Sequence, residues 1–202
     1  MRDGAEVARW SHKPEVVAFD SHSCNQIYSH MMFQIPFFIR DFPDHEKHKY
    51  KILSLITEHD NRSIHQDNIQ KISRTDWKFN EGKKKYAEYV LSILDKDIKS
   101  LLGTMKYDMI RYQGVWYQQY NRTDYHSWHR HGNSEWNLVY YLEFAKDCPA
   151  TEFRNPVNAD ETFIPDVHEG QYILFPSLLS HRSAPNQSRE RKTVIAINIT
   201  TS

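Results

Sequence analysis

The sequence predicts an α+β fold in which N-terminal helices buttress an antiparallel β-barrel or sandwich. Three observations predict it: segments with helical spacing come first, segments that alternate every two residues follow Gly103, and Pro and Gly interrupt the second half at short intervals. The 202 residues fit a polar N-terminal arm over residues 1–30 and a single domain over residues 31–202. We expect helices at about 43–58 and 81–102 and a β core over about 107–200.

The composition argues against several classes of protein. Lys plus Arg and Asp plus Glu number 26 each, so no net field favours a nucleic-acid partner. The two cysteines, Cys24 and Cys148, are too few for a disulfide framework or a thiolate metal site. No apolar run approaches the roughly 20 residues that cross a bilayer, and the N-terminus lacks the apolar segment of a signal peptide. We therefore expect a cytoplasmic protein with no membrane partner.

The first elements are an edge strand and a helix. Residues 32–39 combine β-type side chains with Pro36, and proline cannot donate a hydrogen bond to a β-ladder. Pro43 and Asp44 then introduce a helix, because aspartate caps free N–H groups at a helix start. Residues 59–79 are rich in Asp, Asn and Ser, which predicts a loop.

The clearest helix of the sequence spans residues 81–102. Apolar side chains recur there at steps of four and three, at Tyr86, Val90, Leu94, Ile98 and Leu101. Lysines and acids cover the remaining face, and Gly103 supplies a stop. This pattern predicts a helix that packs against the outside of a sheet.

After Gly103 the sequence has the two-residue period of strands. Residues 110–120 predict a long strand with one polar and aromatic face, made of Ile110, Tyr112, Trp116, Gln118 and Tyr120. Such a face is typical of a barrel that encloses a wet cavity. Further strands are expected at 136–144, 171–175 and 192–200, with short strands and loops over 145–170. Asn137 is polar within an apolar strand and is a candidate substrate contact.

Histidines near the centre of this β half predict a metal site. His129 and His131 are two residues apart in an extended segment and so share a side, and His181 can close the site from another strand. Neutral imidazole is a common ligand of Fe, Zn, Cu and Ni. Arg191 and Thr193 share a face of the last strand and can hold one carboxylate, although Arg191 also fits an ordinary surface ion pair. The residues predict a mononuclear metal site with an anion pocket beside it.

The same residues carry a resemblance to a known family. The matching blocks are His129-X-His131-X-Asn133-Ser134, Val139-Tyr140-Tyr141-Leu142, Gly170-X-Tyr172-X-Leu174-Phe175-Pro176-Ser177, His181, and Arg191-X-Thr193 with Asn198. They resemble the Fe(II)- and 2-oxoglutarate-dependent oxygenases, in particular small members found in phages and marine bacteria. The likeness covers residues 30–200, and its distal half is the specific part.

The resemblance implies a double-stranded β-helix, which is a jelly-roll or cupin-like barrel. It implies that Fe(II) is the cofactor, that 2-oxoglutarate is the co-substrate, and that dioxygen hydroxylates a C–H bond of a small molecule or peptide, with release of succinate and CO2. The catalytic residues would be His129, His131, His181 and Arg191, with the three histidines on the metal and Arg191, Thr193 and Tyr117 on 2-oxoglutarate.

One departure from the family keeps alternatives open. Most members present His-X-Asp or His-X-Glu, whereas the acidic position here is His131, or Asn133 if His131 is the first ligand. Three imidazoles are the favoured set. The others are His131 and His181 with water, or a carboxylate supplied by Asp124 or Glu135. A zinc hydrolase, a non-oxidative cupin-like metal-binding module and a degenerate, non-catalytic family member are the alternative functions.

Overall fold

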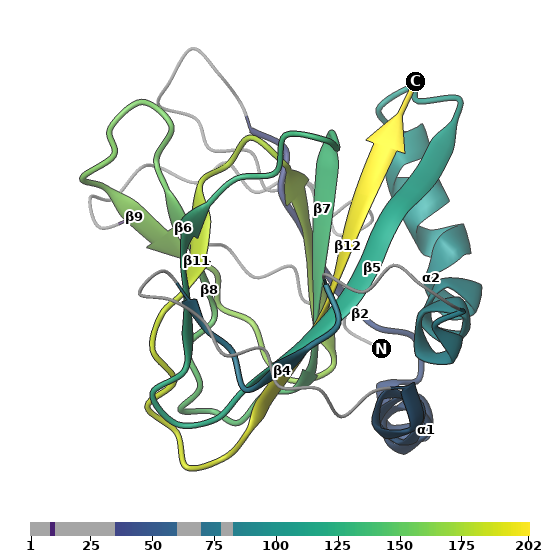
Figure 1. The fold of residues 1–202 in the computed structure, drawn as a ribbon. Coiled ribbons are helices and arrows are strands. Elements are labelled where there is room, and N and C mark those ends of the chain that lie inside the picture. The colour runs from purple at the N-terminus through teal and green to yellow at the C-terminus, as the bar shows by residue number, and fades with distance from the viewer. Residues whose placement is uncertain (1–8, 11–34, 60–69, 78–82) are drawn as a thin grey trace.

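Two facing antiparallel sheets and two helices make up the fold (Figure 1). The computed structural model describes residues 9–10, 35–59, 70–77 and 83–202. The minor sheet has the order β1 (Arg9–Trp10), β9 (Thr162–Ile164), β8 (Thr151–Arg154), β11 (His181–Ser183), β6 (Tyr125–His129) and β3 (Gln70–Lys71). The major sheet has the order β2 (Phe38–Asp41), β10 (Gln171–Pro176), β7 (Trp136–Glu143), β12 (Lys192–Thr201), β5 (Ile110–Tyr120) and β4 (Arg74–Thr75).

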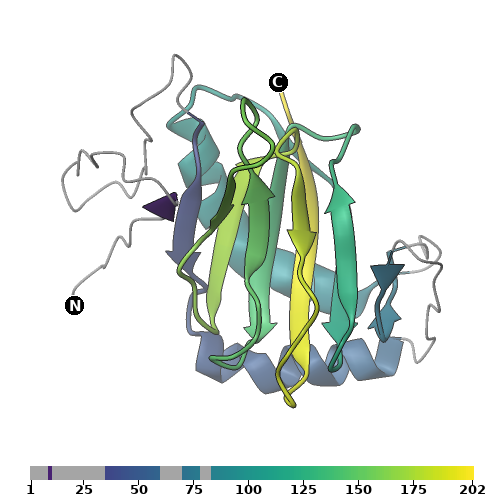
Figure 2. The same cartoon turned by 90° about the vertical axis from the view of Figure 1, so that its left-hand side faces the viewer.

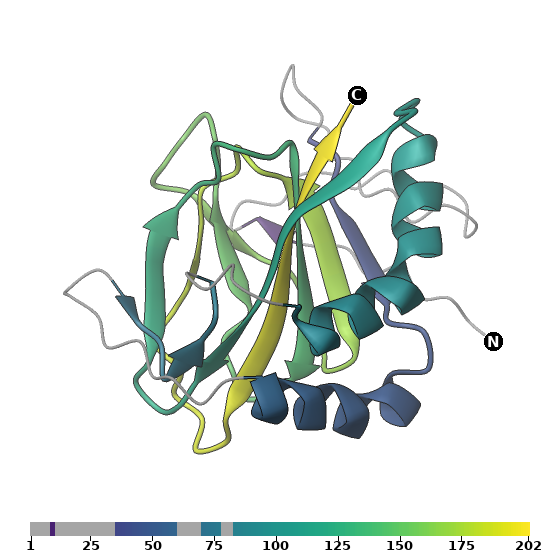
Figure 3. The same cartoon turned by 45° about the vertical axis from the view of Figure 1, so that its right-hand side comes forward.

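Helices α1 (His45–His59) and α2 (Lys85–Gly103) lie on the outer side of the major sheet. Viewed from the minor sheet the helices are behind the strands (Figure 2), and they come toward the viewer when the right-hand side of Figure 1 is turned forward (Figure 3). Neighbouring strands are antiparallel throughout, with the crossovers between sheets that a jelly roll requires. The α+β, double-stranded β-helix architecture expected from the sequence is confirmed.

The major sheet separates two apolar cores, because successive side chains of a strand point to opposite faces. In β12, Val194 packs into the core between the two sheets. Ile195 and Ile197 instead join the core under the helices. The face of the strand on which a side chain lies therefore decides whether it can reach the space between the sheets.

Helix α2 confirms the sequence prediction. Its buried residues include all five that share the predicted stripe, Tyr86, Val90, Leu94, Ile98 and Leu101. Complete burial of a large apolar side chain contributes about 1.5–3 kcal/mol, so this stripe holds α2 against the sheet. The helix ends at Gly103, as expected.

The N-terminal elements agree with the prediction in part. Among the described residues, strand β2 lies at the edge of the major sheet and pairs only with β10. Residues 32–34 of the predicted strand lie outside that part of the chain. The predicted loop over residues 59–79 is wrong at β3 and β4, which add a short strand to one edge of each sheet. Within the predicted N-terminal arm, β1 pairs with β9, and the rest of residues 1–30 lies outside the described residues. None of the described helices has the length and hydropathy needed to span a membrane.

A β-bulge corrects the predicted alternation of β5. The pairing with β12 passes from Asn198 opposite Gly114 to Ile199 opposite Tyr112, so Gln113 is an extra residue. Beyond the bulge the faces exchange, and Ile110 and Tyr112 pack against the core under the helices. The polar and aromatic face toward the minor sheet therefore consists of Trp116, Gln118 and Tyr120, without Ile110 and Tyr112.

Candidate metal centre

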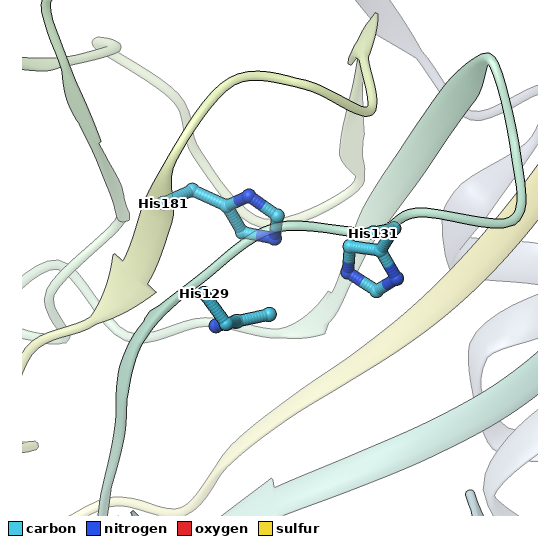
Figure 4. A group of neighbouring side chains, drawn as sticks. All are labelled: His129, His131 and His181. Carbon is cyan, nitrogen blue, oxygen red and sulfur yellow. The ribbon is translucent and has the colours of Figure 1, made fainter.

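Three histidines predicted from the sequence converge between the sheets (Figure 4). His129 is the last residue of β6, His131 follows in the connection to β7, and His181 opens β11, directly opposite His129 in the ladder. One ligand nitrogen of each ring lies within 4.8 Å of those of the other two. These nitrogens are close enough together to share one metal ion.

Backbone carbonyls orient two of the rings. Nδ1 of His129 lies 2.8 Å from the Ser127 carbonyl oxygen, and Nδ1 of His181 lies 2.9 Å from that of Leu179. A carbonyl only accepts hydrogen bonds, so Nδ1 carries the proton in both rings. Nε2 then keeps its lone pair for a metal, and the carbonyls fix the tautomer.

Burial keeps the histidines uncharged. Desolvation, with a smaller contribution from His129, lowers the pKa of His131 to about 4. Desolvation and the neighbouring histidines hold the pKa of His181 well below its usual value, and desolvation also lowers the pKa of His129. Neutral imidazole is the form that binds metals, so the cluster is ready to bind one at neutral pH.

The carboxylates considered from the sequence do not enter the cluster. Asp124 accepts a hydrogen bond from the backbone N–H of Asn121 at 2.8 Å and lies 3.4 Å from the ammonium of Lys71. Glu135 accepts a hydrogen bond from the backbone N–H of Thr201 at 3.0 Å. Within the described part of the chain, only histidines form this ligand group. A divalent ion held there would keep its full charge of +2, which favours an anionic co-ligand.

A cavity of about 40 Å³ lies at the histidines. Its wall includes side chains from both sheets: Trp116, Gln118, Tyr120, His126, Asn137, Thr151, Ser183, Val194, Ala196 and Asn198, besides the three histidines. Among these, Tyr120 and Thr151 are buried, whereas Trp116 and His131 are part-exposed. The cavity therefore has a closed end near Tyr120 and a more exposed end near Trp116.

The structure does not bring the predicted 2-oxoglutarate residues to this cavity. Arg191 is exposed and forms two hydrogen bonds of 2.9 Å with the carboxylate of Glu143, to which Thr193 also donates. Tyr117 packs in the core under the helices, with its ring 5.7 Å from that of Tyr86. Arg191 and Thr193 do share a partner, as predicted, but both lie on the face of β12 opposite to Val194, and the β-bulge that places Glu143 opposite Thr193 keeps this partner out of the cavity wall. The structure therefore brings none of Arg191, Thr193 and Tyr117 to the wall of the cavity.

Arg182 lines the cavity and is paired with Glu152 at 2.6 Å. A second cation, Lys192, is buried behind the cavity wall. It is 1% exposed and pairs with Tyr120 across the β5–β12 ladder, on the face that turns toward the minor sheet. Its ammonium donates to the Pro149 carbonyl oxygen at 2.6 Å and to Oγ of Ser183 at 2.9 Å. Burial lowers the pKa of Lys192 to about 7. Alternation along β12 turns Val194 inward and therefore also turns Lys192 inward. This alternation was the signal in the sequence that could have identified Lys192.

His126 is a fourth histidine of the cavity that the sequence analysis missed. Its ring stacks on that of His129 at 3.9 Å, and its Nδ1 lies 3.3 Å from Nε2 of Gln118. Strict alternation would place residues 126 and 129 on opposite faces. The β6–β11 register shifts between His181 and Ser183, and this irregularity turns both rings to one side.

A second group of potential ligands lies at the N-terminal end of helix α1, where an ammonium already pairs with one of its members. Nε2 of His45 lies 3.6 Å from Glu169 and 3.9 Å from Glu46. The Lys49 ammonium forms an ion pair with the same Glu169 oxygen that faces His45. A metal ion would have to displace Lys49, so the three histidines between the sheets are the better candidate for a metal centre.

Comparisons with known proteins agree with this geometry at the level of the fold. The sequence matches no protein-family model and no curated protein. Among solved structures, it is similar to a viral collagen prolyl hydroxylase from Paramecium bursaria Chlorella virus-1 in a 2OG complex, with a TM-score of 0.57 and 17% identity over 81% of this chain and 94% of that one.

Two bacterial structures give similar scores. A Pseudomonas putida prolyl-4-hydroxylase has a TM-score of 0.61 and 11% identity, over 83% of this chain and 94% of that one. An oxidoreductase of the 2OG-Fe(II) oxygenase family from Burkholderia pseudomallei has a TM-score of 0.61 and 11% identity, over 81% of this chain and 84% of that one. The chain thus has the jelly-roll fold of the 2-oxoglutarate- and Fe(II)-dependent oxygenases, as the resemblance of its sequence implied.

Proposed function

We propose that this protein is an oxygenase that uses Fe(II) and 2-oxoglutarate to hydroxylate a C–H bond of a small molecule or a peptide. The observation that carries the proposal is the cluster of His129, His131 and His181 inside a cavity of this fold, with the buried ammonium of Lys192 behind the cavity wall. A metal ligand set thereby lines the cavity, and a cation for an anionic co-substrate reaches the wall of the cavity through Ser183.

The histidines fit a divalent metal. Each offers a neutral nitrogen, and two of the rings are held by carbonyl groups, as is usual for metal-binding histidine. Iron sites of this fold commonly include one carboxylate, which His131 replaces here. An ion bound only by neutral ligands would be more electropositive and would bind an anionic keto acid more strongly.

The closed end of the cavity fits the carboxylate of a keto acid. Tyr120, Thr151 and Ser183 line it with hydroxyl groups, and Lys192 donates to Ser183 from behind. An ammonium has three donors, and two of those of Lys192 are used by described residues, which leaves one for an acid oxygen. Lys192 thus replaces Arg191 as the proposed partner of 2-oxoglutarate.

In this proposal the protein binds, positions and shields. The bound metal and keto acid supply dioxygen activation, with release of succinate and CO2. His129, His131 and His181 hold the metal, Lys192 fixes the keto acid by its far carboxylate, and the apolar residues of the inner core keep bulk water from the closed end. Substrate enters from the end near Trp116, where the wall is part-exposed.

Absorption spectroscopy under anaerobic conditions tests the proposal. Fe(II) with 2-oxoglutarate should give a weak metal-to-ligand charge-transfer band in the visible. His181→Ala should abolish it, because a ligand is lost, and Lys192→Met should weaken it by loss of keto-acid affinity. Arg191→Ala and the exposed His168→Ala are the matched controls and should leave it unchanged. A wild-type protein that shows no band at saturating ligand contradicts the proposal.

Among the residues that the structure describes, no carboxylate joins the cluster, and this favours one other function, a non-oxidative metal-binding module with a cupin-like barrel. Three histidines also suit Zn²⁺, which commonly binds three imidazoles and a water. In that case metal binding would be unaffected by 2-oxoglutarate, and Lys192→Met would have no effect on any ligand. Titration of the metal-loaded protein with 2-oxoglutarate distinguishes the two functions.

A further inference from the structure

Two asparagines at the more exposed end of the cavity carry the inference. Asn137 of β7 and Asn198 of β12 are directly opposite each other in the ladder, and both line the cavity. They are 3% and 7% exposed. Cross-strand neighbours on one face have Cβ atoms about 4.5–5.5 Å apart, so their amide groups lie side by side.

Each asparagine has one amide atom without a hydrogen-bond partner among the described residues. Oδ1 of Asn137 accepts the hydroxyls of Ser134 at 3.3 Å and Ser177 at 3.2 Å, and its Nδ2 has no partner. Nδ2 of Asn198 donates to Asn133 at 3.4 Å, and its Oδ1 has no partner. A buried polar group without a hydrogen bond costs about 1–3 kcal/mol. The pair therefore offers one donor and one adjacent acceptor to a molecule in the cavity.

The donor is fixed in position relative to the metal centre. Ser177 accepts the backbone N–H of His131 at 3.3 Å with its carbonyl group and donates its hydroxyl to Asn137. Oγ of Ser134 also lies 2.9 Å from Oγ of Ser177, and each hydroxyl has one proton, which it donates either to Asn137 or to the other serine. The Trp116 ring, which also lines the cavity, lies 5.8 Å from that of His131 and supplies an apolar wall. A ligand bound to the asparagines would thus lie next to the metal-binding histidines.

We propose that Asn137 and Asn198 bind an amide edge of the substrate, with a C=O group accepting from Asn137 and an N–H group of the same edge donating to Asn198. Two groups present such an edge. One is a primary carboxamide, and the other is a residue of an extended peptide, whose own N–H and C=O point to the same side. An isolated trans amide presents its N–H and C=O to opposite sides and matches only one asparagine at a time. The inference names the substrate class of the proposed oxygenase and rests on that function only for the oxidation step.

Titrations monitored by NMR, with the side-chain amides ¹⁵N-labelled and the metal site loaded with diamagnetic Zn²⁺, test the inference without turnover. Acetamide represents a carboxamide, and N-acetylglycine N-methylamide represents an extended peptide residue. N-methylacetamide, with its opposed groups, and methyl acetate, which lacks the donor, are matched control probes. We expect a saturable shift of the Asn137 Nδ2 resonances with one of the first two probes, and binding of the control probes that is about tenfold weaker.

Variants assign the effect to the two side chains. Asn137→Asp keeps the side-chain oxygen that accepts from the serines and replaces the Nδ2 donor with an oxygen. Asn198→Leu removes the Oδ1 acceptor and keeps a similar side-chain volume. Each should weaken binding of the preferred probe by about tenfold, read from the probe's own signals. Asn121→Ala, in an exposed turn, should not change it. Visible absorption of bound Co²⁺ confirms that each variant retains the fold of the metal site.

Two results overturn the inference: equal binding of all four probes, or binding of the preferred probe that survives both asparagine substitutions. The charge-transfer band with Fe(II) and 2-oxoglutarate reports separately on the proposed function. A normal band with no amide-selective binding removes the amide site and leaves the oxygenase. Selective amide binding without the band removes the oxygenase and leaves a metal protein with an amide-binding cavity.

Discussion

Lys192 lies opposite Tyr120 across the β5–β12 ladder, with its ammonium 5.3 Å from the centre of the tyrosine ring. Tyr120 lines the cavity, and Arg191, one residue before Lys192, is exposed and bonded to Glu143. Lys192 and Arg191 are neighbours along the strand, but the first is turned toward the cavity and the second lies on the surface.

Lys192 should make stability depend on pH in the alkaline range. Its pKa is about 7 in the folded protein and 10.5 is its ordinary value, so between these pH values the unfolded chain binds a proton that the folded one lacks. Stability then rises with pH across this window. We expect the free energy of unfolding of the wild type, minus that of Lys192→Met, to increase from pH 7 to pH 10 in urea titrations. A difference that stays constant with pH would contradict the burial of this ammonium.

The histidine cluster should destabilise the metal-free protein in acid. The pKa values of His126 and His131 are lowered from 6.5 to about 3 and about 4, and those of His129 and His181 are also lowered. As pH falls below 6.5 the unfolded chain takes up these protons before the folded chain does, so stability is lost from pH 6.5 downward.

Urea unfolding at pH 7 and pH 5 measures this loss. His126→Gln should make the loss of stability smaller, because the unfolded chain then takes up one proton fewer than in the wild type. The substitution His168→Gln, at an exposed histidine, should leave the loss unchanged. Bound Zn²⁺ should raise the stability at pH 7 further, because it binds only the folded arrangement of neutral imidazoles. Equal pH dependence in His126→Gln and wild type would show that this ring is not held neutral by the fold.

The ligand at position 131 should tolerate a carboxylate but not an apolar side chain. His131→Asp introduces the oxygen donor that accompanies two histidines at many iron sites, and we expect Co²⁺ binding to be retained. His131→Leu should weaken binding by more than about 100-fold, since even the loss of groups that support ligands weakens metal sites by 10–100-fold. Visible absorption titrations give both affinities. Wild-type affinity in His131→Leu would mean that His131 is not a ligand.

Gly170 should be intolerant of a side chain. Its φ is +89°, and a Cβ atom there would lie 3.0 Å from the ring of His45. We expect Gly170→Ala to destabilise the protein by about 1–3 kcal/mol through backbone strain and this contact. Gly132→Ala is the matched control, because a Cβ atom there meets nothing within 4 Å. Thermal unfolding compares the two, and equal melting temperatures would contradict the expectation.

The sequence by itself predicted the longer elements and the three histidines of the candidate metal centre. The apolar stripe of α2, the edge position of β2 and the two-residue alternation of the later strands are local patterns, because 3.6-residue and two-residue periods follow from backbone geometry. The spacing of His129 and His131, with His181 before the last strand, was sufficient to predict that the three imidazoles would meet.

Only the tertiary structure decided which side chains face the cavity. Alternation fixes relative faces within a strand, but a bulge such as that at Gln113 exchanges them, and the irregular register at His126 brings a fourth ring inward. The pairing of β12 with β5 and β7 turns Lys192 toward the space between the sheets, while Arg191 stays exposed. The side chains that face the cavity depend on contacts between strands far apart in the sequence. The two-residue and 3.6-residue periods describe only local structure and do not predict these contacts.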